Sequence, residues 1–261
     1  MNMIWLYEIP TWLLGIGIIG LFVLLSSAGL LLTRGWAKKV AVDNDFANYF
    51  LSAVGVFYAL LVGLIAVAVW ENLSFVEGVV ADEAVAISEM YSDLEGYPQP
   101  QRDHLRGLLR RYLHHVIEQE WPVQQKGEEP TSGGPLTETI VHEWMQFEPV
   151  TEGQKAIHAE ALRELNVFLG FRRERLQSVE TGLPGLLWVV VLMGAALTIG
   201  LTYFFYTENR RLQLLLTGVL STMVGLVVFV ILAMDRPLIG ELGVPPDSFR
   251  EVLAAVIHDA E

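Results

Sequence analysis

The sequence predicts an all-α integral membrane protein, with four transmembrane helices in two hairpins and a central soluble helical bundle. Two observations carry this prediction: four uncharged apolar runs are each long enough to cross a bilayer, and an acidic polar segment separates the second run from the third. The chain of 261 residues is 52% hydrophobic yet carries a net charge of -13, so apolar and acidic stretches must be segregated along it.

Each apolar run is 21 to 24 residues long and contains no Asp, Glu, Lys or Arg. A helix rises about 1.5 Å per residue, so about 20 residues cross a hydrocarbon core of about 30 Å. The first run could also be a signal peptide, but residues 1–11 lack the basic start that such a peptide needs. The predicted spans are residues 12–32, 50–70, 183–206 and 212–234.

The spans divide the chain into three parts. Residues 1–72 form the first membrane hairpin, 73–182 a soluble acidic helical domain, and 183–261 the second hairpin with a C-terminal tail. The polar segment from 71 to 182 holds 20 acidic and 10 basic side chains, most of the net charge. Strand signals are absent, so this domain is predicted to be a helical bundle.

Apolar stripes at three- and four-residue spacing locate the helices of the domain. The second span continues beyond the bilayer through Val80 and Ile87, and the break at Pro98 and Pro100 precedes a new helix that runs to about Trp121. The Gly, Glu, Pro and Ser content of residues 126–135 predicts an exposed loop. A short helix follows over residues 136–147, and a longer one over 162–176 leads into the third span, so extensions of the second and third membrane helices help to build the bundle.

The sequence contains no pattern typical of an enzyme, a metal site or a cofactor site. There is no cysteine, glycine-rich phosphate loop or nucleophile elbow. His114 and Glu118 are four residues apart, but one such pair is better explained by a solvated helix face than by a metal. We therefore expect no catalysis, no cofactor and no metal, and the acidity of the chain excludes nucleic acid as a partner.

The second span carries small residues, which let copies of a helix approach closely. They are Ser52, Ala53, Gly55, Ala59, Gly63 and Ala66. One interpretation is tight packing within a single subunit. The functional alternative is a helix that lines a pore in a ring of subunits, with Phe57 as a hydrophobic constriction, Ala53 one turn earlier, and Leu60 and Leu61 beside it.

Acidic residues follow the second span at Glu71, Glu77, Asp82 and Glu83. They could form an acidic vestibule ring, or they could be an ordinary solvated helix surface. One helix cannot supply the six to eight oxygens that calcium requires, so a calcium site is not expected.

The distribution of basic residues does not decide the orientation of the protein in the membrane. The hairpin loops hold five basic residues, which the positive-inside rule places in the cytoplasm, against four close to the membrane on the side of the domain. The lack of a basic residue before the first span also argues for an outside N-terminus.

Residues 55–62, followed by Trp70, resemble the second membrane helix of bestrophins. Nearly the whole chain is similar to the bacterial, archaeal and plant family that carries a bestrophin-like domain of unknown function. The supporting features are Glu83-Ala84, Tyr112, Glu120-Trp121, Arg172 and Arg175 ahead of Pro184 and Trp188, and Asp235-Arg236-Pro237.

The resemblance implies a pentameric channel whose second helices line a hydrophobic neck, with the soluble domain in the cytoplasm. Phe57 would match a neck aromatic, whereas Ala53 stands where a neighbouring neck position lies, which would widen the constriction. The calcium-binding acidic run of animal bestrophins has no counterpart, and the acidic domain would attract cations.

We therefore expect a homo-oligomeric, bestrophin-like ion channel, pentameric by resemblance, in the cell (inner) membrane, with the lipid bilayer and inorganic ions as its partners. The alternative is a membrane-anchored sensing or scaffold protein that conducts nothing. No charged residue lies inside a span to mark an ion path, so the sequence is compatible with both.

Overall fold

The computed structural model describes residues 4–40, 44–205, 207 and 209–258. These residues are largely helical and form no β-strand, which confirms the predicted all-α class. They divide into two compact units. The membrane unit consists of Met1–Asn72, Gly182–Asp235 and Gly240–Leu242, and the soluble unit of Leu73–Thr181, Arg236–Ile239 and Gly243–Glu261.

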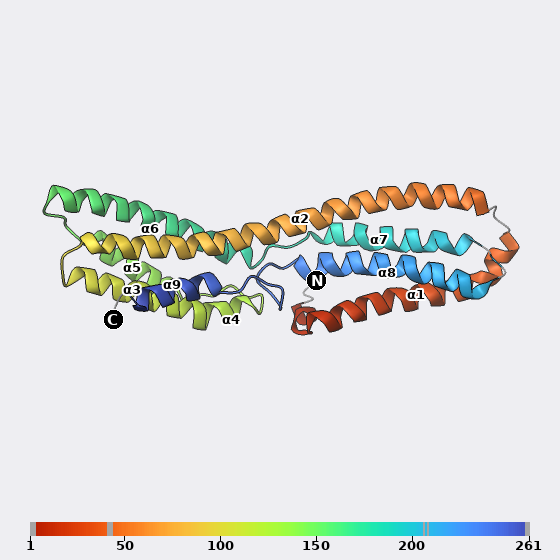
Figure 1. The fold of residues 1–261 in the computed structure, drawn as a ribbon, viewed down its shortest axis with the longest axis horizontal. Helices are drawn as coiled ribbons and strands as arrows, with labels where there is room; N and C mark the ends of the chain where they lie inside the picture. Colours follow the sequence, from red (N-terminus) through yellow and green to blue (C-terminus); the bar gives the residue numbers. More distant parts are fainter. Residues whose placement is uncertain (1–3, 41–43, 206, 208, 259–261) are drawn as a thin grey trace. The chain divides into compact units, whose positions relative to one another are not determined.

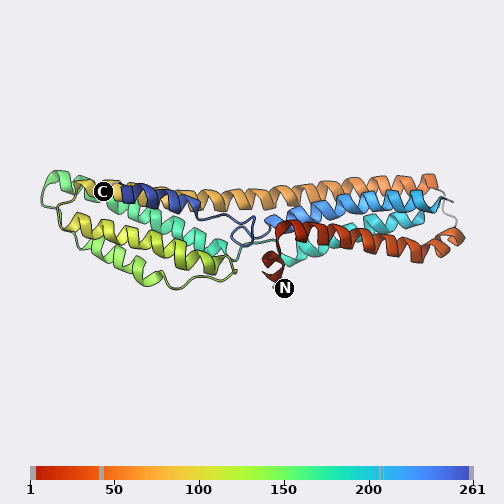
Figure 2. The same cartoon turned by 60° about the horizontal axis from the view of Figure 1, so that its bottom comes forward.

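The membrane unit is built from four helices, each long and apolar enough to cross a bilayer, as predicted. In Figures 1 and 2 these helices run side by side, the second of them with its first half only. A short 3-10 helix, η1, precedes them, and a 3-10 turn, η4, follows α7. The bounds are η1 (Ile4–Glu8), α1 (Thr11–Val40), α2 (Asn44–Asp93), α7 (Gly185–Leu201), η4 (Thr202–Phe204) and α8 (Arg210–Met234).

Close backbone approach holds α1 against α8. A Cβ added at Gly225 of α8 would lie 3.2 Å from the Cα of Ile19 on α1, so a side chain there would force the helices apart. Small residues at helix interfaces act in this way in membranes, where water supplies no hydrophobic drive between helices. The core between α2, α7 and α8 is aliphatic and contains Val62, Ile65, Val69, Val191, Ala195, Val224, Val228 and Ile231.

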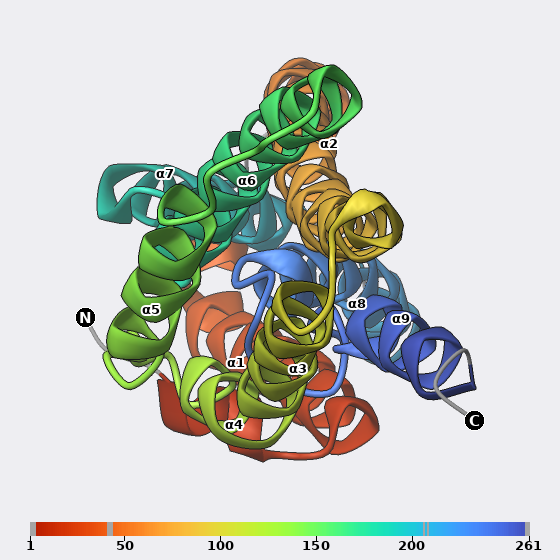
Figure 3. The same cartoon turned by 90° about the vertical axis from the view of Figure 1, so that its left-hand side faces the viewer.

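The soluble unit contains the end of α2 from Leu73 onward, the helices between α2 and α7, and the last helix of the chain, α9 (Figure 3). A break at Tyr97–Pro100 separates α2 from the next helix, as the prolines predict. The bounds are η2 (Leu94–Gly96), α3 (Gln101–His115), a π-helical turn η3 (Val116–Glu120), α4 (Trp121–Gln124), α5 (Gly134–Met145), α6 (Glu152–Ser178) and α9 (Asp247–His258).

Aromatic side chains fill the core of the soluble unit. Tyr112 and Phe168 meet edge to face, and so do Trp121 and Phe249. Phe249 belongs to α9, a helix in the stretch that the sequence places in a C-terminal tail. Its apolar side is buried in this core, so the C-terminal segment is a structural part of the soluble unit.

The third membrane helix does not extend into the soluble unit, contrary to expectation. Helix α6 ends at Ser178 and α7 begins at Gly185, with a non-helical stretch between them. Pro184 lacks a backbone donor and has an extended backbone immediately before α7. Only the second membrane helix continues without a break, since α2 reaches Asp93.

Candidate functional site

Within the membrane unit α2 has one anchored side. Val62, Ile65 and Val69 are buried against the other helices of the unit. The hydroxyl of Tyr58 donates to the backbone carbonyl of Val191 at 3.2 Å, and its ring occupies the space that a side chain at Gly194 would fill. This side of the helix is committed to packing within one chain.

The opposite side of α2 is apolar and exposed. Phe57 is 75% exposed, and Leu60 and Leu64 are similarly open. Ala53 and Val67 share this side because residues spaced by three or four lie on one face of a helix. Leu61 does not: it is half-buried and packs on the core, so three of the four expected pore-lining residues share a face and one lies beside it.

This exposed face carries no charge across the predicted span. From Phe46 to Trp70 the sequence contains no Asp, Glu, Lys or Arg, and the first charged residue on the face is Glu71, four positions after Val67. In a single chain the face would contact lipid. In a ring of subunits it could border a narrow water-filled path with an aromatic at Phe57, the kind of constriction that dewetting closes.

The acidic positions after the second span separate into two kinds. Glu71, Glu77 and Asp82 are exposed on α2, as a vestibule surface requires. Glu83 is fully buried in the soluble unit and forms an ion pair with Arg175, with 2.7 Å between Oε2 and Nε. Its place in an acidic vestibule is therefore corrected, because a buried and paired carboxylate cannot face permeating ions.

Glu83 belongs to a buried network of charged and polar side chains from α2, α3, η3, α4 and α6. Arg175 also donates to a carboxylate oxygen of Glu120 at 2.9 Å and to the side-chain amide oxygen Oε1 of Gln124 at 2.6 Å. Arg172 donates to both oxygens of Glu120, at 2.7 and 2.9 Å. Two carboxylates and two guanidinium groups thus balance one another in the buried interior, which is the condition for charges to remain there.

Tyr112 joins the two halves of this network. Its hydroxyl donates to Oε1 of Glu83 at 2.5 Å and accepts from Nη1 of Arg172 at 2.7 Å. Burial raises the pKa of this phenol well above its usual range, and the charge of Glu83 raises it further. The tyrosine is therefore a permanent hydrogen-bond donor that fixes the position of Glu83.

The charges keep Glu120 ionised. Burial by itself raises the pKa of its carboxyl, but the hydrogen bonds and positive charges of Arg172 and Arg175 outweigh burial and hold the pKa below its ordinary value. The loop before α5 closes over this pair. A Cβ at Gly133 would collide with the carboxylate of Glu120 and the guanidinium of Arg172, so glycine is needed for this close approach.

A second polar cluster lies at the start of α7, in the membrane unit. Asp235 accepts from the backbone amide of Leu183 at 2.6 Å and from the indole nitrogen of Trp188 at 3.4 Å. A carboxylate at a helix N-terminus satisfies free amide groups and the helix dipole. Asp235 therefore holds the beginning of α7 to the end of α8.

The sequence pattern singles out most of these polar residues individually, but it does not predict that they form one hydrogen-bonded network. The signal was present: Glu83 lies between Val80 and Ile87 on an apolar stripe, and Arg172 follows Phe168 by four residues. A charge at a core position of an amphipathic helix indicates a buried ion pair. No cluster of three or more metal-ligating side chains occurs in the described part of the chain, and the His114–Glu118 pair is exposed.

Comparisons with known proteins agree with this architecture. A family model described as the Bestrophin-like domain matches residues 20–249. A variant of a bacterial bestrophin homologue from Klebsiella pneumoniae superimposes with a TM-score of 0.65 at 13% identity, over 93% of this chain and 97% of that one. A membrane protein variant gives a TM-score of 0.68 at 12% identity, over 92% and 96%. A comparison with curated proteins gives no match.

Proposed function

Since the chain belongs to the Bestrophin-like family, we propose that it is one subunit of a homo-oligomeric ion channel in which α2 lines the pore. The observation that carries the proposal is the two-sided character of α2. One side is anchored within the subunit by Tyr58 and Val62, and the other is an uncharged face containing Ala53, Phe57 and Leu60.

A single copy of this face cannot enclose a water path, so the channel requires a closed ring. Cyclic symmetry places the same face of every subunit toward the axis, and the family resemblance favours five subunits. Phe57 would then form the constriction. Ala53, one turn away, has no aromatic side chain to narrow the neck at its level. We therefore expect the pore to be wider there than at Phe57.

The acidic residues suggest which ions gather near the pore. Glu71 ends the uncharged face, and Glu77 and Asp82 are exposed farther along α2. In a ring each residue would be repeated once per subunit, and repeated negative charge concentrates cations. We therefore expect these positions to favour cation entry.

The proposal is tested in two steps on the full-length protein. The first is to measure the mass of the protein complex in detergent. A ring predicts a whole multiple of the 29.1 kDa subunit mass, and we expect five copies. The second is unitary current in planar bilayers. Phe57→Ala should raise the unitary conductance because it removes the ring that narrows the path.

The matched control is Leu24→Ala on α1, because Leu24 is 70% exposed on a membrane helix outside the proposed pore. It should leave the conductance unchanged. A monomeric mass would contradict the ring. A ring without unitary currents, or with currents that Phe57→Ala leaves unaltered, would contradict the pore and favour a membrane-anchored sensing or scaffold protein.

A further inference from the structure

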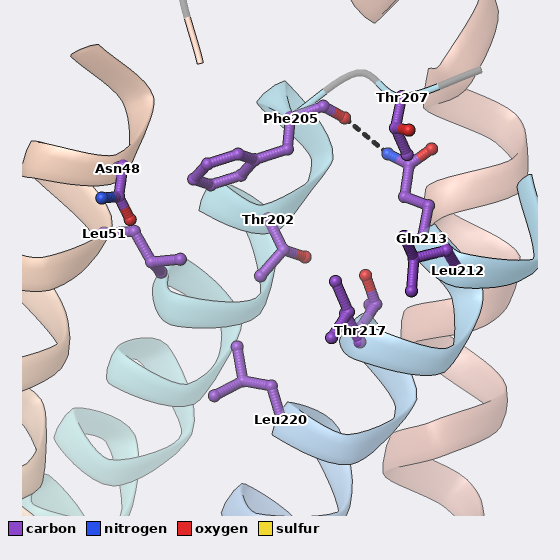
Figure 4. A pocket seen from close by; sticks show the side chains of 10 residues that line it. Asn48, Leu51, Thr202, Phe205, Thr207, Leu212, Gln213, Thr217 and Leu220 are labelled. Atoms are coloured by element: carbon purple, nitrogen blue, oxygen red, sulfur yellow. Dashed lines mark hydrogen bonds between the residues drawn. The ribbon is translucent and has the colours of Figure 1, made fainter. Parts of the chain in front are cut away.

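A cavity of about 420 Å³ opens within the membrane unit, at the end of the helices where the hairpin loops lie (Figure 4). Its walls come from the start of α2, from η4 with the residues after it, and from the first turns of α8. The described lining residues are Asn48, Leu51, Thr202, Phe205, Thr207, Leu212, Gln213, Leu216, Thr217 and Leu220. None of these is charged. The size falls within the range of about 300–1,000 Å³ that is typical of ligand sites.

Thr217 is the most deeply buried of the polar residues that line this cavity. The residue is 3% exposed, yet the structure gives its hydroxyl no hydrogen bond to any described residue, and in Figure 4 the hydroxyl points into the space between η4 and α8. On the same helix, by contrast, the hydroxyl of Ser221 donates to the carbonyl of Thr217 and that of Thr222 donates to the carbonyl of Gly218. No hydrogen bond among the described residues competes for the Thr217 hydroxyl, so it is placed to donate to an acceptor group of a ligand in the cavity.

The neighbouring Gln213 is committed to the protein. Its amide oxygen accepts from Arg34 at 2.7 Å, and its amide nitrogen donates to the carbonyl of Phe205. Arg34 also donates to the carbonyl of Thr207. These bonds hold the Gln213 side chain in the wall of the cavity, so it does not compete with Thr217 for a ligand.

Basic side chains surround this end of the membrane unit. Arg210 and Arg211 are exposed in the first turn of α8, immediately before the lining residues Leu212 and Gln213. The first turn of a helix adds partial positive charge from its free amide groups. The hairpin segments 34–45 and 207–211 together contain five basic and three acidic residues. An anionic head group would therefore be attracted next to an apolar cavity.

We propose that this cavity binds part of one acyl chain of an anionic phospholipid. The Thr217 hydroxyl donates to an ester carbonyl oxygen of the lipid, and Arg210 and Arg211 face its phosphate. Lipid is the solvent of these helices, and basic groups at the ends of membrane helices recognise anionic head groups. The inference concerns a different site from the proposed pore and does not depend on conduction.

The test is native mass spectrometry of the delipidated full-length protein after incubation with phosphatidylglycerol. Thr217→Phe should abolish the lipid adduct because the ring fills the cavity. Val219→Phe places the same ring on the same helix at a side chain that is 54% exposed and does not line the cavity, so it should keep the adduct. Thr217→Val preserves the volume and removes only the hydroxyl, and should weaken the adduct even if the Phe variant misfolds.

The contribution of the head group is tested with phospholipids that have identical acyl chains and different head groups. Phosphatidylglycerol should bind more tightly than phosphatidylcholine, and replacing Arg210 and Arg211 together by Gln should remove the difference. The proposal is overturned if the two lipids bind equally to the unaltered protein. It is also overturned if inorganic phosphate displaces the lipid, or if the Phe and Val variants at position 217 bind phosphatidylglycerol as tightly as the Val219→Phe control.

Discussion

At the scale of single residues, the most informative feature is the pairing of four buried charges. Arg175 contacts Glu83, Glu120 and Gln124 at the same time, from a position that is fully buried. Removing one member leaves a buried charge without compensation, which costs about 3–5 kcal/mol in other proteins. The network therefore positions α2 relative to α3 and α6 within the soluble unit.

We predict that Arg175→Met lowers the free energy of unfolding by about 3–5 kcal/mol. The control is Arg173→Met, because Arg173 lies on the same helix and is exposed. Its effect should stay below about 0.5 kcal/mol. Thermal unfolding in detergent, followed by tryptophan fluorescence, measures both variants, since Trp121 and Trp144 are buried in this unit.

A double variant sharpens this test. If Glu83 and Arg175 act as a pair, Glu83→Gln combined with Arg175→Met should destabilise the protein by less than the sum of the two single changes, because no uncompensated partner remains. Additive effects, or equal melting temperatures for the Met variants at positions 173 and 175, would show that the network contributes nothing specific.

The loop before α5 was accessible from sequence only in part. Residues 126–135 have the composition of an exposed loop, yet Pro130 and Gly133 are buried and Gly133 covers Glu120. Composition reports the average preference of a segment for water. It carries no information on which backbone atom will lie against a charge that comes from another helix.

At the scale of elements, α2 depends on few contacts within the membrane unit. Only 11% of its most apolar stretch is buried within the chain, the lowest share among the four membrane helices. The contact between Tyr58 and Gly194 is one of its attachments to α7, and glycine there provides room for the ring. The weak attachment fits a helix whose other side serves a second partner, which can be lipid or another subunit.

We predict that Gly194→Val displaces the ring of Tyr58, breaks its hydrogen bond to Val191 and destabilises the membrane unit by about 1–3 kcal/mol, as overpacking does in other cores. Gly200→Val is the matched control, because Gly200 lies on the same helix with no atom within 4 Å of an added Cβ. Equal melting temperatures for the two variants would contradict this role of Tyr58.

Helix α9 shows why one element was missed. Its apolar residues Phe249, Val252, Leu253 and Val256 have helical spacing, so the pattern was readable. The segment follows the last membrane span and is short, so nothing local indicated a core for it to join. That core is assembled from α2, α3 and α6, which lie far away in the sequence.

At the scale of the whole molecule, one candidate span lies between the first hairpin loop and the soluble unit, so we predict that the two lie on opposite sides of the membrane. The family resemblance favours a cytoplasmic soluble unit, whereas the charge count of the loops favours the reverse. We predict a cytoplasmic soluble unit, because five basic residues against four is a small excess for the positive-inside rule.

The orientation is measurable because the chain contains no cysteine. We predict that a membrane-impermeant maleimide added to intact cells modifies Lys38→Cys, at the exposed end of α1, and spares Thr131→Cys, an exposed position in the soluble unit. Both sites should react after the membrane is permeabilised. Labelling of Thr131→Cys alone in intact cells would reverse the assignment.

The sequence by itself determined that this protein is all-helical and contains four helices able to span a membrane. Both properties follow from local chemistry: uncharged runs of about 20 residues suit lipid, and helical periodicity marks the bundle. Only the tertiary structure decided that Glu83 is buried, that Leu61 packs inward, that α9 completes the core and that a cavity lies beside Thr217. Each depends on which distant side chain supplies the opposite charge, the apolar neighbour or the empty space, and periodicity along one helix does not contain that information.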